Sequence, residues 1–233
     1  AQVDALDAGK GFVTHYGHAS EYSLNTVMSD DDVDALTNAP DFPVYVSCGC
    51  FAGNFAYAAM DAAGERLLTN PNGGAVAYLG NTDVGLGPGG GTALIKAFYR
   101  ALFDGIDRLG DALFDARNNF YSNESNLHSE TLGIRWTQFV VVLFGDPEMP
   151  VRTMQPATLA VFHPQALGRG EQCLQVEATI DGVPATGITV VLHRPGDFIY
   201  RRETDARGRT VFRFTPGAPG DILVTATAPQ SLP

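Results

Sequence analysis

The chain has 233 residues, 45% of them hydrophobic, enough for one medium-sized domain and a small one. With 15 Lys and Arg against 26 Asp and Glu, the formal net charge of −11 argues against nucleic acid or an anionic membrane as the main partner. No run of about 18 apolar residues occurs, so we expect no membrane span. The 3 cysteines are an odd number, which leaves at least one thiol unpaired within the chain.

Two apolar segments near the start, residues 11–16 and 42–47, are predicted strands that each precede a chemically reactive side chain. His18 follows the first strand and Cys50 the second, 32 positions further on (50 − 18). Catalytic groups gather at the carboxyl ends of strands in an open α/β sheet, so these two side chains meet if their strands are neighbours. An imidazole beside a thiol accepts its proton or stabilises its anion, and such a pair attacks carbonyl carbon.

Helices are expected after each of these segments. For residues 28–37, Ser29 and the following aspartates favour capping and first-turn acids over a cation site. For residues 51–68, the small apolar residues predict a helix that begins directly after Cys50. The positive N-terminal end of that helix would favour the thiolate.

In the middle of the chain, the pattern of residues predicts another buried strand, then a glycine-rich loop, then one or two further helices. Residues 75–79 are the strand, and residues 80–91 form a candidate pocket wall in which Asn81 and Thr82 are predicted substrate contacts; a plain connector is the alternative. No Lys-Ser/Thr follows the glycines, which excludes a phosphate-binding P-loop. Residues 92–118 predict one long helix, or two that break near Gly105 or Gly110.

The region before residue 152 ends in a polar stretch and an ambiguous apolar one. His128 lies in the polar stretch and is predicted to be a surface histidine in preference to a second catalytic base. Residues 139–144 are compatible with helix and with strand, because periodicity alone does not separate the two.

Beyond residue 152 the helical spacing gives way to short alternating segments separated by turn signals. This pattern predicts a β-sandwich in which Cys173 has no disulfide partner. The predicted strands are residues 158–162, 172–180, 188–194, 209–214 and 221–227.

Four segments resemble, in order, the motifs of the gingipain-like cysteine peptidases, relatives of the caspases. Residues 16–20, YGHAS, are similar to the family's histidine motif, and residues 49–55, GCFAGNF, to its cysteine motif, which selects Cys50 over Cys48. Residues 72–80 resemble the family's next strand, and residues 143–151 its closing segment. Four motifs in the right order are much more specific than any single one, and the resemblance covers roughly residues 10–153.

The resemblance implies a fold and a set of roles. Residues 1–153 are expected to form a caspase-like α/β domain, an open, mostly parallel sheet flanked by helices, and residues 154–233 an immunoglobulin-like β-sandwich. Cys50 would be the nucleophile that forms a thioester acyl-enzyme, His18 the general base and acid, and the backbone N–H groups of Ala19 and Cys50 the oxyanion hole. Ala19 replaces a glycine of the family motif; it keeps the N–H group, so efficiency is affected more than mechanism.

The predicted function is that of a cysteine endopeptidase, secreted or at the cell surface of a bacterium, which hydrolyses protein or peptide substrates. Two alternatives stay open: a catalytically degenerate binding or assembly module, and a transpeptidase-type attachment enzyme. The resemblance predicts that the chain lacks an N-terminal part of its domain, so the upstream portion of its own precursor is a candidate partner. No cofactor or catalytic metal is expected; a structural Ca²⁺ is compatible with an Asp-rich exported protein, although no calcium-loop pattern occurs.

Overall fold

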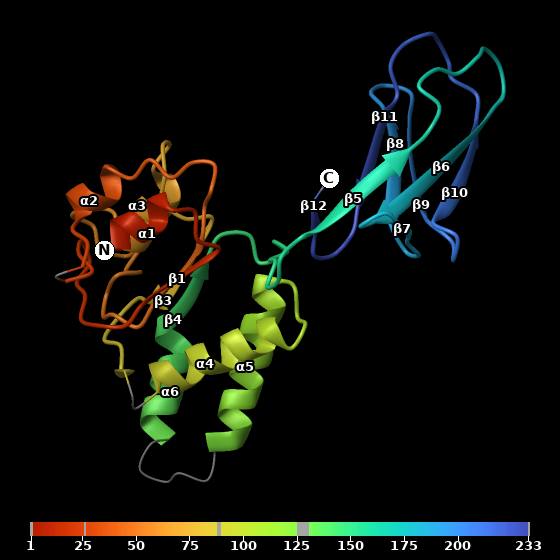
Figure 1. Ribbon diagram of the computed structural model, residues 1–233. Coiled ribbons are helices and arrows are strands. Elements are labelled where there is room, and N and C mark those ends of the chain that lie inside the picture. Colours follow the sequence, from red (N-terminus) through yellow and green to blue (C-terminus); the bar gives the residue numbers. More distant parts are fainter. Residues whose placement is uncertain (1, 26, 88–89, 125–130, 233) are drawn as a thin grey trace. The chain divides into compact units, whose positions relative to one another are not determined.

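The computed structural model divides into two compact units, Ala1–Val151 and Arg152–Pro233, each described by itself below (Figure 1). The sequence placed this boundary between residues 153 and 154. Within the residues that the structure describes, no helix is both long and apolar enough to cross a membrane. His128, the predicted surface histidine, lies outside the described residues, which are 2–25, 27–87, 90–124 and 131–232.

The first unit is built on a four-stranded sheet in the order β1-β2-β3-β4. Its strands are β1 (Phe12–His15), β2 (Val44–Ser47), β3 (Ala77–Asn81) and β4 (Val141–Phe144). The first three strands are parallel, and β4 is antiparallel to β3. This is the open, mostly parallel sheet that the sequence predicted.

Helices cover both faces of this sheet (Figure 1). Successive side chains of a strand point to opposite faces, so Val44 and Val46 join the core formed with α4 and α5, whereas Tyr45 joins the core formed with α1, α2 and α3. All of β2 is buried, as is typical of a parallel strand between helical layers. The helices of the described residues are α1 (Gln2–Asp7), α2 (Asp30–Asp34), α3 (Ala63–Thr69), α4 (Gly91–Phe103), α5 (Leu109–Glu124) and α6 (Thr131–Val140).

The helix predicted for residues 51–68 is wrong over most of its length, because α3 begins only at Ala63. Residues 51–60 form turns, and the apolar side chains that suggested a buried face are exposed, Phe55 by 61%. The backbone of this segment forms local turns and also bonds to the sheet: the Asn54 N–H donates to Phe51 O, and the Gly53 N–H donates to Asn81 O, both at 2.9 Å. Cys50 therefore does not lie at a helix N-terminus, and the prediction that a helix dipole favours its thiolate is wrong.

Other helix predictions are confirmed with different bounds. Helix α2 carries a capping box in which the Ser29 hydroxyl accepts from the Asp32 N–H and the Asp32 carboxylate accepts from the Ser29 N–H, so capping is the role of these residues. The stretch 92–118 is two helices, and the chain between them passes through Gly105 at a φ of +109°. Residues 139–144 contain both structures, since α6 ends at Val140 and β4 begins at Val141.

The second unit consists of two sheets that share one core. A five-stranded sheet has the order β10-β6-β5-β12, with β7 paired to β6, and a three-stranded sheet has the order β11-β8-β9. Their strands are β5 (Ala157–Phe162), β6 (Gln172–Ile180), β7 (Val183–Pro184), β8 (Thr189–Arg194), β9 (Phe198–Glu203), β10 (Arg209–Phe214), β11 (Leu223–Thr227) and β12 (Ser231–Leu232). Both sheets contribute to the shared core, with Val176 from β6 and Val190 from β8 fully buried. The immunoglobulin-like classification stays a prediction.

Sequence reasoning missed β9 in this unit. Its residues are almost all exposed, so the alternation that marks a half-buried strand is absent. The cysteines carry no disulfide: Cys173 is exposed with a free thiol, and Cys48 and Cys50 are free as well.

Candidate active site

Two neighbouring parallel strands carry the candidate catalytic residues to one edge of the sheet. β1 pairs with β2, and His15 is the register partner of Ser47. His18 lies three residues after His15, and Cys50 lies three residues after Ser47, so both lie at equivalent positions beyond the sheet edge. The condition for the two side chains to meet, that their strands are neighbours, is therefore fulfilled.

The loops that bear these residues pack directly on one another. We call residues 16–21 the histidine loop and residues 48–53 the cysteine loop. A Cβ placed on Gly49 would lie 2.4 Å from the Cβ of Ala19 and 3.3 Å from the Ala19 nitrogen. His18 is exposed and Cys50 is half-buried, so both are reachable from solvent next to this contact.

The side chain of Asn81, at the end of β3, holds the cysteine loop in place. Its amide nitrogen donates to the carbonyl oxygens of Cys48 at 3.1 Å and Gly49 at 3.0 Å. The residue is only 2% exposed and its amide is bonded to these two carbonyls, which favours a structural role; a substrate contact of Asn81 stays a prediction. Sequence reasoning located Asn81 in the site, but the partner of its amide depended on the fold of the cysteine loop.

The backbone next to Cys50 is unusual. Phe51 has a φ of +60°, a left-handed conformation that residues other than glycine rarely adopt. Its N–H donates to Asp83 O at 3.0 Å, which fixes this turn against the loop after β3. In the same loop the Gly85 N–H donates to the Cys50 sulfur at 3.3 Å. The thiol is thus fixed from the side of β3.

Helix α6 supports the loop that follows β3. The Trp136 indole N–H donates to Val84 O at 2.7 Å. Thr82 is half-buried, and its N–H and hydroxyl both donate to Val140 O, at 2.8 and 3.2 Å. A substrate contact of Thr82 stays a prediction. Residues 88–89 of the predicted pocket wall lie outside the described residues.

The structure separates the two neighbouring thiols by burial. Cys48 lies in the core between the sheet and α4, and burial raises the pKa of its thiol to about 11. A thiol with this pKa is almost entirely protonated at neutral pH and is a poor nucleophile. Cys50 is therefore the better candidate, in agreement with the motif.

Sequence reasoning missed a polar pair beneath the two loops. The Nδ1 atom of His15 lies 2.9 Å from the Ser47 hydroxyl, and the two residues are 2% and 1% exposed. Such burial excludes a serine nucleophile attacking a substrate. The only sequence signal was the offset of 32 residues between them, equal to that between His18 and Cys50.

The predicted oxyanion donors are available. Within the described part of the chain, the N–H groups of Ala19 and Cys50 have no acceptor in the protein. His18 likewise has no hydrogen-bond partner among the described residues, so the structure assigns no carboxylate that orients it. No cluster of three His, Cys, Asp or Glu side chains suited to a metal ion occurs in that same part.

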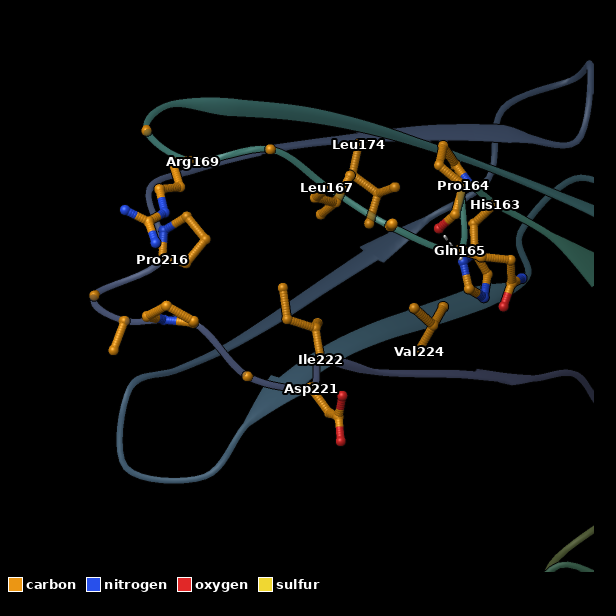
Figure 2. A pocket seen from close by; sticks show the side chains of 17 residues that line it. His163, Pro164, Gln165, Leu167, Arg169, Leu174, Pro216, Asp221, Ile222 and Val224 are labelled. Atoms are coloured by element: carbon orange, nitrogen blue, oxygen red, sulfur yellow. Dashed lines mark hydrogen bonds between the residues drawn. The ribbon is translucent and has the colours of Figure 1, made fainter.

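The second unit contains a cavity of about 840 Å³, whose lining residues are drawn in Figure 2. Two loops, residues 163–170 and 216–222, form its walls, and Leu174 and Val224 also line it. All its lining residues come from the second unit, and none is a candidate catalytic residue.

An accessible imidazole and a half-buried thiol at the carboxyl edge of the parallel strands define the class of the first unit: an α/β domain with a candidate thiol–imidazole site. The chain belongs to peptidase family C25, whose family model matches residues 2–152.

Relatives and solved structures agree with this membership. Gingipain R2 of Porphyromonas gingivalis is 23% identical over 203 residues, which are 79% of this chain and 25% of that protein. Gingipain R1 of the same organism is 22% identical over 203 residues, again 79% of this chain, and 19% of its own length.

The crystal structure of the Arg specific cysteine proteinase gingipain R (RgpB) matches with a TM-score of 0.75 at 18% identity, covering 99% of this chain and 53% of that one. A complex of the RgpB pro- and mature domains from Porphyromonas gingivalis matches with the same TM-score and identity. At this identity the likeness shows the fold. The chain spans about a quarter of the length of gingipain R2 and about half of the matched RgpB chain.

Proposed function

We propose that the protein is a cysteine endopeptidase in which Cys50 is the nucleophile and His18 the general base and acid. The observation that carries this proposal is the parallel register of β1 and β2, which places both residues at equivalent positions beyond one sheet edge with their loops in contact. Membership of peptidase family C25 supports it.

The chemistry proceeds in two halves. His18 takes the thiol proton while the Cys50 sulfur bonds to the carbonyl carbon of the scissile peptide. The tetrahedral intermediate collapses as the C–N bond breaks and the imidazolium gives its proton to the leaving amine, which leaves a thioester acyl-enzyme. Water, deprotonated by His18, then attacks the thioester, and the thiol is released with its proton.

Charge develops on the carbonyl oxygen in both halves. The N–H groups of Ala19 and Cys50 are the donors that would bind it, and their lack of protein acceptors within the described residues supports this role. Removing one such donor from an acyl-transfer site costs roughly 10²–10³ in rate. The Cβ of Ala19 touches the cysteine loop at Gly49, so the side chain that replaces the family's glycine also sets the spacing of the two loops.

The partners and location belong to the same proposal. Protein or peptide substrates follow from the reaction. One matched structure is a complex of pro- and mature domains, which supports the prediction that an upstream portion of the precursor is a partner. Export from a bacterial cell and a structural Ca²⁺ stay predictions that rest on the family resemblance.

Hydrolysis of a peptide library followed by mass spectrometry tests the proposal. We expect cleavage products and a thioester adduct on Cys50, both lost in Cys50→Ala and strongly reduced in His18→Ala, whereas Cys48→Ala retains cleavage. The proposal is wrong if cleavage persists in Cys50→Ala. Products joined to an added amine in preference to water would identify a transpeptidase, and a folded protein without adduct would identify a binding module.

A further inference from the structure

The buried pair His15 and Ser47 connects both loops of the candidate site although neither residue reaches solvent. They are the last residues of β1 and β2 and face each other in the sheet register. Their hydrogen bond of 2.9 Å therefore joins the ends of β1 and β2, where the histidine loop and the cysteine loop begin. A buried polar pair of this kind is retained only when its hydrogen bonds are made.

The Ser47 hydroxyl also fixes the first turn of the cysteine loop. Its oxygen accepts from the Gly49 N–H at 3.1 Å, one residue before Cys50. A hydroxyl has one proton and two lone pairs, so it can bond the Gly49 N–H and the His15 ring at once. The Ser47 hydroxyl thus connects the His15 ring to the backbone of Gly49, the residue before Cys50.

The His15 ring fills the space that two glycines leave open. A Cβ on Gly17 would lie 3.0 Å from its Nε2 atom, and a Cβ on Gly49 would lie 3.2 Å from its Cε1 atom. Gly17 directly precedes His18, and Gly49 directly precedes Cys50. One imidazole is thus in contact with the chain immediately before each candidate catalytic residue.

We propose that His15 and Ser47 are positioning residues that set the separation and orientation of His18 and Cys50. The inference rests on the proposed function, because it concerns the same thiol–imidazole pair. Catalytic geometry is sensitive to this kind of support, and a misplacement of 1 Å costs about 10²-fold in rate. Neither residue contacts the substrate, so their removal lowers the rate of the chemical step and leaves substrate affinity unchanged.

The test measures the rate constant for alkylation of Cys50 by iodoacetamide, and kcat and KM for peptide cleavage, in Ser47→Ala and His15→Phe. His15→Phe keeps a ring between the glycines but loses the hydrogen bond. We expect both variants to lower kcat and the alkylation rate constant by roughly 10-fold or more with KM unchanged. His15→Asn restores a hydrogen-bonding group toward Ser47 and recovers part of the rate.

Thr204→Val is the matched control. Thr204 is a buried hydroxyl of the second unit that likewise accepts one N–H, from Ile188, and donates to a carbonyl, that of Ala185. Its removal costs stability but should leave the Cys50 rate at the wild-type value.

Combination with His18→Ala separates this inference from the proposed function. If Ser47 acts by positioning the pair, its removal changes the Cys50 rate when His18 is present and has little further effect in His18→Ala. Folded Ser47→Ala and His15→Phe proteins that react at the wild-type rate, or a Ser47 effect of equal size without His18, would overturn the inference. A His18→Ala protein with the wild-type rate would instead overturn the proposed function.

Discussion

Gly49 is the residue at which the histidine and cysteine loops come closest. We predict that Gly49→Ala, whose new methyl group would overlap the Ala19 side chain, separates the loops and lowers the rate of Cys50 alkylation by roughly 10²-fold. Gly11→Ala is the control, because a Cβ there meets no atom within 4 Å. Equal rates in Gly49→Ala and Gly11→Ala would show that the contact between the loops is unimportant.

The buried ring of His15 predicts a pH-dependent stability. Burial lowers its pKa from the ordinary value of 6.5. As the pH falls below about 6.5, the unfolded chain binds a proton that the folded ring does not, so the free energy of unfolding decreases. Above that pH both states hold a neutral ring and the effect vanishes.

Urea unfolding at pH 7.5 and 5.5 measures this dependence. His15→Phe has no such proton to bind, so its free energy of unfolding should fall less over this interval than that of the wild type. Identical decreases in the two proteins would contradict the assignment of a depressed pKa to His15.

At the scale of elements, the end of β3 supports the cysteine loop. We predict that Asn81→Ala, which leaves the buried carbonyls of Cys48 and Gly49 without their side-chain donor, costs about 1–3 kcal/mol per unsatisfied group and slows Cys50 alkylation. Asn81→Asp should be worse, because a carboxylate would face the two carbonyl oxygens.

Asn38 provides a matched control within the same unit. It is also a buried asparagine whose amide nitrogen donates to two carbonyls, those of Asp41 and Gly74, but it is not part of either loop. Asn38→Ala should lose similar stability while the Cys50 rate is kept. If both alanine variants slow alkylation equally, the effect reflects general loosening of the fold.

The elements that the sequence predicts well are those in which local pattern and tertiary burial agree. The apolar runs that became β1, β2 and β3 are buried on the sheet, and the spacing of residues 92–118 gives the paired helices α4 and α5. The helix directly after Cys50 was wrongly predicted because Phe55, Tyr57 and Met60 are exposed and the Gly53 N–H is bonded to the end of β3. The hydrogen bond that replaces helical bonding at Gly53 has its acceptor at Asn81, which is distant in sequence, so no local pattern reveals it.

The same distinction holds for the site. His18 and Cys50 are candidates because they stand in motif positions, which the sequence alone reveals, and the greater burial of Cys48 also favours Cys50 as the reactive thiol. The link between His15 and Ser47 depends on the register of two strands, and it becomes visible only when the sheet is known.

At the scale of the whole molecule, the two units have separate cores. The core that contains Phe98 lies in the first unit, and the core that contains Phe212 lies in the second. Each Phe→Ala change should cost about 3–5 kcal/mol of stability in its own unit.

We therefore predict that Phe98→Ala lowers the urea concentration at which the alkylation rates of Cys48 and Cys50 change. Phe212→Ala should leave the alkylation rate of Cys50 unaffected below that urea concentration. Circular dichroism and thiol labelling along one urea titration report both units. Loss of Cys50 reactivity in Phe212→Ala in the absence of urea would show that the site needs an intact second core.

The most direct test of the central claim is the alkylation rate of each cysteine, located by mass spectrometry, in the wild type and in His18→Ala. We predict that Cys50 reacts faster than the exposed thiol of Cys173, that this advantage disappears in His18→Ala, and that Cys48 stays unmodified because it is buried with a pKa raised to about 11. A Cys50 rate that is unchanged by His18→Ala, or no higher than that of Cys173, would contradict a thiol–imidazole pair in this protein.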